Sequence, residues 1–176
     1  MIKLVRMLFI FVGFLGLASN SFAADVTMRI SIQLPMKSHL GQNLLLFKND
    51  VEKKSNGEIE VQIYDSAQLY KDKEVPAAVG SGSIESGVAS LTRYVGDIPA
   101  VDLFYQPFLL NSEEKVRKAV AKGSSIRGPI DKAIEGTGST VLWWQAYGSA
   151  IMLSKGEAIK NPSDTVSYTH LTLPTT

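Results

Sequence analysis

The residues best suited to binding a ligand follow a short strand near the middle of the chain. The segment Ser86–Ala89 has no bulky side chain before Val88, and it ends in a polar cluster that includes Ser90, Arg93 and Tyr94. Polar groups at the carboxyl end of a strand in an open α/β sheet face the crevice in which ligands bind. The pattern therefore predicts a binding cleft built from loops on a rigid sheet. A solvated surface arginine is the alternative interpretation of Arg93.

Catalytic chemistry is not indicated by the motifs of this sequence. Ser90 lies in no G-x-S-x-G turn, and His39 is the only histidine before the final segment, so a base for a serine nucleophile is missing. Gly80-x-Gly82 precedes a strand instead of a helix, and Glu85 stands where a dinucleotide loop needs its third glycine. The lack of cysteine excludes thiolate chemistry and cysteine-bound metals. We predict no catalytic residue, no metal site and no cofactor.

Composition places the chain among ordinary globular proteins. It has 176 residues, which suits one domain or slightly more, with 45% apolar and 20% charged residues. The formal net charge is +1, and no basic stripe or RNA-binding signature is present. Nucleic acid is therefore not an expected partner.

Residues 1–23 have the build of a secretory signal. Lys3 and Arg6 give a positive start, and the apolar run Met7–Leu17 is too short to span a bilayer comfortably. Ser21 and Ala23 supply small residues at the positions that signal peptidase reads. We expect cleavage after Ala23 and export, with an uncleaved membrane anchor as the alternative.

The first part of the mature chain predicts a strand, a helix and a second strand. Val26–Ile32 alternates between apolar and polar residues, as does Ile59–Ile63. Between them, apolar residues recur at helical spacing from the N-cap Ser38 to a left-handed cap at Asn56-Gly57. A strand, a helix of about four turns and a strand form a βαβ unit, so we expect parallel pairing and a right-handed crossover.

Later elements are predicted from shorter patterns. We expect a helix from about Asp72, a packed irregular segment at Val101–Leu110, a helix capped by Ser112 with Val116, Ala119 and Val120 buried, a helix at Ile126–Glu135, a strand buried on both faces at Thr140–Trp144, a short strand at Ala150–Ser154 and a helix start at Asn161–Asp164. Trp143 and Trp144 face opposite ways on a strand, so at most one reaches the cleft, and packing of both is the alternative.

The last eleven residues differ from the rest of the chain. Residues 166–176 read VSYTHLTLPTT and resemble a translated sequencing adapter. We interpret them as a cloning or assembly artefact, with a genuine polar tail as the alternative.

Several segments in one register carry a family resemblance. From about Ala24 to Asp164, the mature chain resembles the substrate-binding proteins of tripartite ATP-independent periplasmic (TRAP) transporters. The matching segments are Glu52–Gly57, Ser66–Leu69, Ala78–Glu85, Leu103–Leu110, Trp143–Ser154 and Asn161–Asp164. Each segment alone is weak, whereas their order and spacing together are specific.

The resemblance implies a type II-like periplasmic binding protein, in which two α/β lobes close over a small organic anion such as a carboxylate. It implies a first lobe at residues 24–147 and the start of a second at 148–165. The ligand-facing candidates carried over by position are Gln33, Asp72, Ser90, Arg93, Gln145 and Tyr147. The expected partners are the anion and the integral-membrane permease subunits of the transporter, and the expected location is the periplasm.

Departures from the family leave the solute open. Well-known members have an acidic residue where Ser90 stands and an arginine where Ile151 stands. In the family, the segment corresponding to Asn161–Asp164 is followed by a strand whose arginine pairs with the ligand carboxylate, and residues 166–176 do not match it. We therefore expect a first lobe plus a stub of the second. A binding protein of an ATP-driven importer and an exported α/β enzyme domain are the alternative functions.

Overall fold

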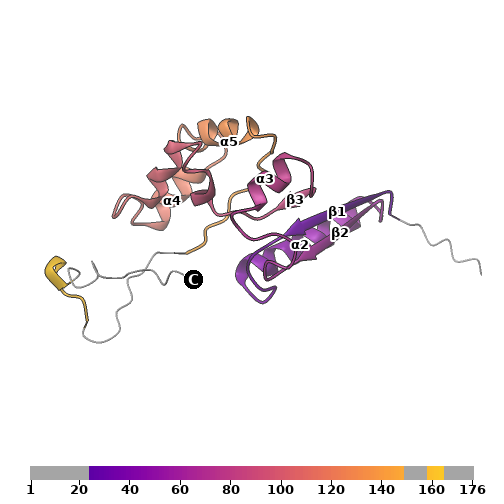
Figure 1. Cartoon of the computed structure of the whole chain (residues 1–176), viewed down its shortest axis with the longest axis horizontal. Coiled ribbons are helices and arrows are strands. Elements are labelled where there is room, and N and C mark those ends of the chain that lie inside the picture. The colour runs from indigo at the N-terminus through magenta and orange to yellow at the C-terminus, as the bar shows by residue number, and fades with distance from the viewer. Residues whose placement is uncertain (1–23, 149–157, 165–176) are drawn as a thin grey trace, which may run out of the picture. The chain divides into compact units, whose positions relative to one another are not determined.

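The computed structural model describes residues 24–148 and 158–164, and the chain forms two units, Met1–Gln145 and Ala146–Thr176. The strands and α-helices of the described residues lie in the first unit, and a single 3₁₀ turn lies in the second (Figure 1). Their bounds are β1 Val26–Ser31, α2 His39–Lys54, β2 Ile59–Tyr64, α3 Val75–Gly80, β3 Ser86–Gly87, two 3₁₀ helices at Leu91–Tyr94 and Pro99–Tyr105, α4 Glu113–Val120 and α5 Arg127–Glu135. In these described ranges, no helix is both long enough and apolar enough to cross a bilayer.

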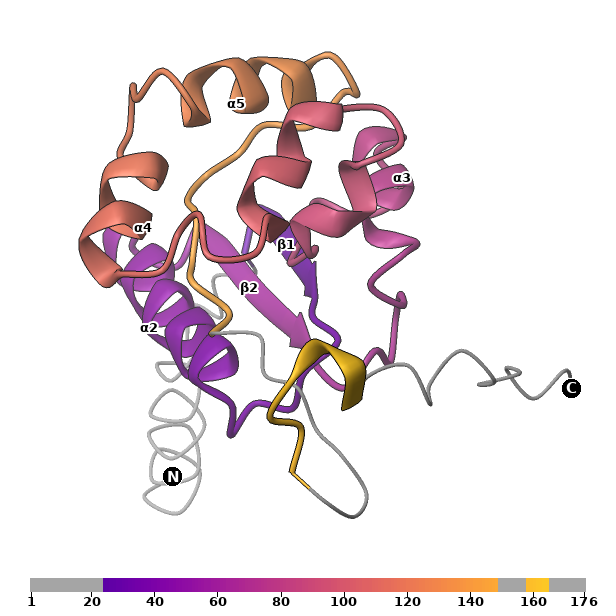
Figure 2. The same cartoon turned by 90° about the vertical axis from the view of Figure 1, so that its left-hand side faces the viewer.

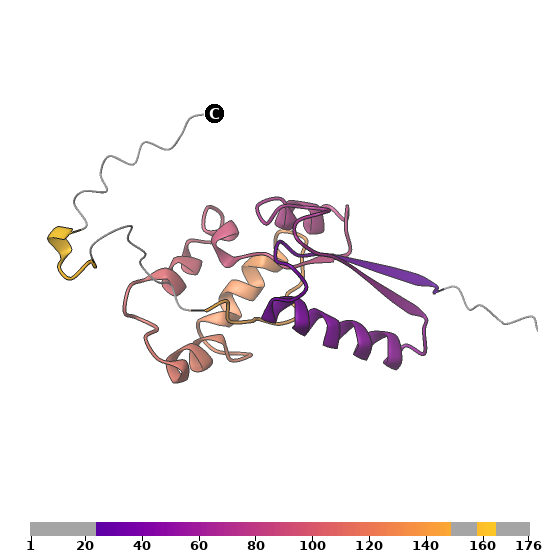
Figure 3. The same cartoon turned by 90° about the horizontal axis from the view of Figure 1, so that it is seen from below.

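The predicted βαβ unit is confirmed. The sheet has the order β2-β1-β3, and both strand pairs are parallel. Val26 lies opposite Ile59 at the start of the β1–β2 ladder, and Ser31 lies opposite Tyr64 at its end. β3 is shorter than the expected Ser86–Ala89 and pairs only with the last two residues of β1. The helix α2 runs alongside β1 and β2 (Figure 2 and, from below, Figure 3).

Local sequence signals explain where α2 begins and ends. The Ser38 hydroxyl accepts a hydrogen bond from Gly41 N at 3.1 Å, which satisfies one of the free amides of the first turn. Lys53 and Lys54 lie in the last turn, where cations are favourable. Asn56 and Gly57 follow with φ angles of 52° and 86°, the left-handed conformation that ends many helices. The predicted caps at both ends are thus confirmed.

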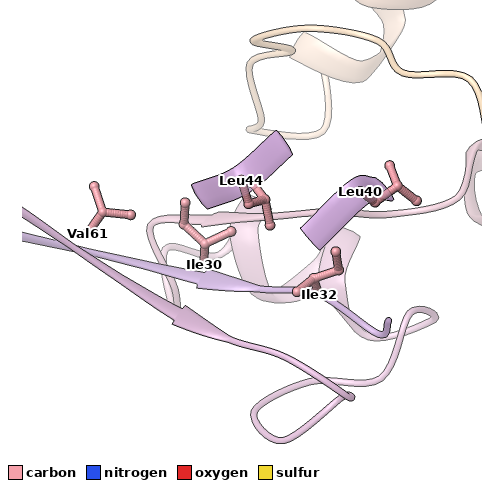
Figure 4. Close-up of a cluster of buried hydrophobic side chains, with 5 residues drawn as sticks. All are labelled: Ile30, Ile32, Leu40, Leu44 and Val61. Carbon is pink, nitrogen blue, oxygen red and sulfur yellow. The ribbon is translucent and has the colours of Figure 1, made fainter. Parts of the chain in front are cut away.

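The core of the βαβ unit lies between α2 and the two longer strands. Ile30, Ile32, Leu40, Leu44 and Val61 are at most 5% exposed and meet between the helix and the sheet (Figure 4). Burying a side chain of this size contributes about 1.5–3 kcal/mol, so these five residues anchor α2 to the sheet.

A second core cluster joins α5 to the segment after β3. Ile98, Val101, Ile130 and Ile134 are at most 6% exposed. Ser112 caps α4 as predicted, accepting a hydrogen bond from Lys115 N at 3.3 Å. Within the expected buried stripe of α4, only Ala119 is buried, and Val116 and Val120 remain partly exposed.

The prediction of a buried strand at Thr140–Trp144 is wrong. The segment has no regular secondary structure, and Leu142 is 56% exposed. A strand requires a neighbour with which to exchange backbone hydrogen bonds, and no described strand pairs with this segment. Instead its side chains pack on other elements: Trp143 contacts Phe47 with ring centroids 5.0 Å apart, and Trp144 contacts Phe104 at 5.2 Å.

Three further expectations have different outcomes. Val101 is buried, but Phe108 is 87% exposed, so the segment Val101–Leu110 is packed only in its first half. The expected strand Ala150–Ser154 lies outside the described residues. At the expected helix start, Asp164 accepts hydrogen bonds from the backbone N–H groups of Lys160 and Asn161 at 2.8 and 2.9 Å, and residues 162–164 form one 3₁₀ turn.

Candidate functional site

Four of the six candidate residues meet at the carboxyl end of the sheet. Gln33 follows β1, Asp72 lies in the loop after β2, and Ser90 and Arg93 follow β3. Gln33 Nε2 donates to Ser90 Oγ at 3.4 Å, and Ser90 and Arg93 both bond to Asp72. The carboxyl ends of parallel strands share one edge, which explains why residues so far apart in sequence come together.

Asp72 is the centre of this cluster. It is 5% exposed, and each of its carboxylate oxygens has a partner. Oδ1 accepts a hydrogen bond from Ser90 N at 2.9 Å, and Oδ2 accepts one from Arg93 Nε. A buried charge is tolerated when it is paired and hydrogen-bonded in this way. Asp72 therefore holds the start of the 3₁₀ helix Leu91–Tyr94 and the arginine within it.

Arg93 remains available to an anion despite this pairing. Its side chain is 43% exposed, and only its Nε is bonded to Asp72. Within residues 24–148 and 158–164, neither terminal guanidinium nitrogen has a hydrogen bond to protein. The two terminal nitrogens form a fork that matches the two oxygens of a carboxylate. The arrangement can thus bind an anion with an arginine whose direction is already set.

Sequence reasoning missed the residue that positions the loop carrying Asp72. Ser31, at the end of β1, is fully buried, and its Oγ both donates to Tyr70 O and accepts from Tyr70 N, each at 3.1 Å. The sequence feature that could have indicated this role is a small hydroxyl residue at the end of an apolar strand. The alternation of Val26–Ile32 puts Ser31 on the polar face of that strand, and the loop leading to Asp72 packs against it there.

The loop after β2 is also held in a costly conformation. Ser66 and Ala67 have φ angles of 51° and 57°, which non-glycine residues adopt at a cost of roughly 1 kcal/mol or more each. Their N–H groups donate to Leu34 O at 3.2 Å and to Ile32 O at 3.0 Å. These two bonds fasten the loop to the segment after β1, beside Gln33.

A close approach of the backbone positions Ser90. A Cβ on Gly87 would lie 2.5 Å from Val75 Cγ1, so only glycine lets β3 pass this near to α3. Val88 N then donates to Ser31 O at 2.8 Å, which continues the ladder beyond β3 toward Ser90.

Of the other two candidates, Gln145 is not joined to this cluster by any hydrogen bond between described residues. Gln145 Oε1 accepts a hydrogen bond from Asn43 Nδ2 on α2 at 2.9 Å. Tyr147 belongs to the second unit and is 57% exposed. Their role in binding stays a prediction.

The Tyr94 hydroxyl lies in the same 3₁₀ helix as Arg93. Burial raises the pKa of the Tyr94 hydroxyl, next to Arg93, above its ordinary value of 10.0, so the phenol is neutral at physiological pH. Among the residues that the structure describes, no three histidine or carboxylate groups gather as metal ligands would.

Comparison with known proteins identifies relatives of the chain. The family profile of the bacterial extracellular solute-binding proteins, family 7, matches residues 30–167. A solute-binding protein of Verminephrobacter eiseniae is 30% identical over 146 residues, covering 81% of this chain and 42% of the relative. The C4-dicarboxylate-binding periplasmic protein DctP of Rhodobacter capsulatus is 28% identical over 154 residues, covering 85% of this chain and 44% of the relative. The chain thus spans less than half the length of these relatives.

Solved structures show the same fold. A TRAP periplasmic solute-binding protein of Pseudomonas aeruginosa with bound L-malate superposes with a TM-score of 0.61 at 19% identity, covering 67% of this chain and 40% of that one. An extracytoplasmic solute receptor of Bordetella pertussis that binds pyroglutamic acid gives a TM-score of 0.59 at 23% identity, covering 64% and 36%. The described sheet and helices are therefore part of a type II-like periplasmic binding fold, as predicted.

The family profile covers well over half of the chain, and the described fold superposes on that of the solved structures. The chain belongs to family 7 of the bacterial extracellular solute-binding proteins.

Proposed function

We propose that the chain is part of a periplasmic receptor that binds a small organic anion and delivers it to the membrane permease of a TRAP-type secondary transporter. Family membership supports a receptor function. Relatives named as dicarboxylate-binding and as TRAP solute-binding proteins favour this transporter class over an ATP-driven importer. An exported enzyme domain is disfavoured because this family consists of solute receptors.

The observation that carries the proposal is the pairing of Arg93 with buried Asp72. An exposed arginine without a fixed partner loses side-chain entropy when it binds a ligand. The hydrogen bond from Nε to Asp72 already restricts the Arg93 side chain. Binding an anion to its terminal fork therefore costs less side-chain entropy. Ser90 and Gln33 lie beside it and offer a hydroxyl and an amide.

The charges of this cluster also indicate which part of the ligand it contacts. Arg93 offers one terminal fork, its charge is already offset by that of Asp72, and Ser90 and Gln33 are neutral. This half of the site therefore suits one carboxylate that is flanked by a hydroxyl, carbonyl or amide group. A second carboxylate would need positive charge from elsewhere in the receptor.

The same proposal includes the organisation predicted from the sequence. Residues 1–23 serve as the export signal, residues 24–147 form the first lobe, and residues 148–165 begin the second. Gln145 and Tyr147 then lie where the chain crosses between the lobes, and residues 166–176 take no part in the receptor.

Calorimetry tests the function in a protein that continues this sequence to the length of its relatives, because both lobes are needed to enclose a ligand. A panel of succinate, malate and pyroglutamate should include an acid that binds in the micromolar range and is recovered unchanged. Arg93→Ala should weaken that binding by roughly thirtyfold or more, as expected for the loss of a charged partner. The variant Arg117→Ala, on the exposed face of α4, is the matched control. Binding that survives Arg93→Ala, or turnover of the acid, would refute the proposal.

A further inference from the structure

The outer edge of β2 has no role in the proposed ligand site. β2 is an outermost strand of the described sheet, with β1 on its inner side. Tyr64 O accepts a hydrogen bond from Ile32 N at 3.0 Å and so points inward. Because backbone groups alternate in direction along a strand, Ile59, Val61 and Ile63 point their N–H and C=O groups outward. Such a row of outward groups is a template on which another strand can add.

Side chains of α2 and of its C-cap residue Ser55 bond to three of the six outward groups. Ile59 N donates to Ser55 Oγ at 3.2 Å, and Val61 N donates to Glu52 Oε1 at 2.9 Å. Lys48 Nζ donates to Val61 O and also to Glu52 Oε1, the latter at 2.7 Å. Both outward groups of Val61 are therefore satisfied by the two members of one ion pair.

The spacing of these side chains along α2 explains how they reach the strand. Lys48, Glu52 and Ser55 are separated by four and three residues, so they form one stripe along the helix. Their stripe lies beside the apolar stripe that fastens α2 to the sheet through Leu40 and Leu44. The core thus holds these polar side chains at the edge of β2.

Another ion pair on α2 shows that this contact is specific. Asp50 and Lys54 have the same spacing and lie 3.0 Å apart, but their side chains are 69% and 76% exposed. Those of Lys48 and Glu52 are about one-third exposed and have backbone partners on β2. The pair Asp50–Lys54 is therefore a control within the same helix.

We propose that Lys48, Glu52 and Ser55 form an edge cap that prevents a second copy of the chain from adding its own β2 to this edge. The strand Ile59–Tyr64 carries β-branched and aromatic residues and one charge, a composition that favours strand pairing. Two copies of one edge can pair about a two-fold axis, since each presents the same outward groups.

Among the described residues, the cap leaves the carbonyl of Ile59 and both outward groups of Ile63 without a hydrogen bond. Ile63 borders a shallow hollow of about 430 Å³ that is lined by Met36, Leu45, Lys48 and residues 61–64. The bonded groups of Val61 separate the free carbonyl of Ile59 from Ile63, so the uncovered groups do not form a run long enough to hold an added strand.

Amide hydrogen exchange on the chain tests the cap directly. At concentrations low enough to keep the double variant Lys48→Ala/Glu52→Ala monomeric, its Val61 amide should exchange about tenfold faster, while Ile32, inside the ladder, should change little. Glu52→Gln keeps an acceptor oxygen for Val61 N and should retain most of the protection. Asp50→Ala/Lys54→Ala should leave both amides unchanged.

Sedimentation of the same variants tests the role in association. The double variant should form dimers or larger species at concentrations at which the wild type and the Asp50→Ala/Lys54→Ala control do not. Equal acceleration of exchange at Val61 and Ile32 would mean that the side chains only stabilise the fold, and would overturn the proposal. Faster exchange at Val61 without added self-association would overturn its second half.

Discussion

Asp72 determines the geometry of the candidate site because both of its oxygens are engaged. Its carboxylate holds the Ser90 amide at 2.9 Å and the Nε of Arg93. The Asp72 carboxylate thus fixes the orientation of the Arg93 guanidinium at the carboxyl edge of the sheet. Sequence reasoning identified both residues, but it assigned each of them to the ligand and not to the other.

Replacing Asp72 should reveal this supporting role in the stability of the fold. Asp72→Ala leaves the Ser90 amide and Arg93 without their shared acceptor and should cost about 1–3 kcal/mol in urea unfolding. Asp72→Asn keeps an acceptor oxygen and should cost less. Asp102→Asn, on the exposed side of the 3₁₀ helix Pro99–Tyr105, should cost little. An Asp72→Ala protein as stable as the Asp102 variant would show that the buried carboxylate is not structural.

Glu85 supplies a pH dependence that belongs to the fold and not to the ligand site. Its carboxylate accepts hydrogen bonds from Arg29 Nε at 2.8 Å, Arg29 Nη2 at 2.7 Å and Arg29 N at 2.9 Å. The Arg29 guanidinium is the main cause that lowers the pKa of Glu85 from 4.5 to about 2. Because the lowered pKa belongs to the folded state, the stabilisation is complete above about pH 4.5 and is lost as the pH falls toward 2.

Urea unfolding across this pH range compares the wild type with Glu85→Gln. The wild type should be slightly more stable at pH 6, by the small amount expected for a pair whose side chains are 39% and 36% exposed. The difference should shrink below pH 4.5 and vanish near pH 2. A difference that stays constant down to pH 2 would argue against the ion pair.

At the scale of elements, the sequence predicts what is local and misses what depends on distant partners. The unit β1-α2-β2 follows from alternation, helical spacing and caps, and the structure confirms it. Thr140–Trp144 has an equally apolar pattern but forms no strand, because pairing requires a neighbour that local sequence does not specify. The aromatic contact of Trp143 with Phe47 joins residues nearly a hundred positions apart, so no local signal predicts it.

The close approach of β3 to α3 is another contact between elements that local sequence does not specify. The variant Gly87→Ala tests it. The added methyl group would meet Val75 Cγ1 at 2.5 Å, so either β3 or α3 must move. Overpacking of this kind costs about 1–3 kcal/mol, and thermal unfolding should show a lower midpoint. Gly96→Ala is the control, since a Cβ there would have no neighbour within 4 Å. Equal midpoints for the two variants would contradict the close packing.

At the scale of the whole molecule, the candidate site could be predicted as a set of positions but not as an arrangement. The resemblance to a family supplied Gln33, Asp72, Ser90 and Arg93, and the fold brings these four together. The pairing of Asp72 with Arg93 joins two loops that follow different strands, so it depends on the sheet as a whole. The hydrogen bonds by which buried Ser31 holds the loop before Asp72 also join distant residues, so the local sequence did not predict them.

We propose that the fork of Arg93, at the carboxyl edge of the sheet, binds the anion. Nuclear magnetic resonance titration of the chain with pyroglutamate or succinate tests this most directly, because the method identifies the residues that contact a ligand even when binding is weak. We expect shifts at the Ser90 amide and at Arg93 Nε–H, with a dissociation constant on the order of millimolar or weaker. These shifts should disappear in Arg93→Ala and should not be produced by sodium chloride at equal ionic strength. Shifts that centre on the lysines of α4, or that persist in Arg93→Ala, would contradict the account.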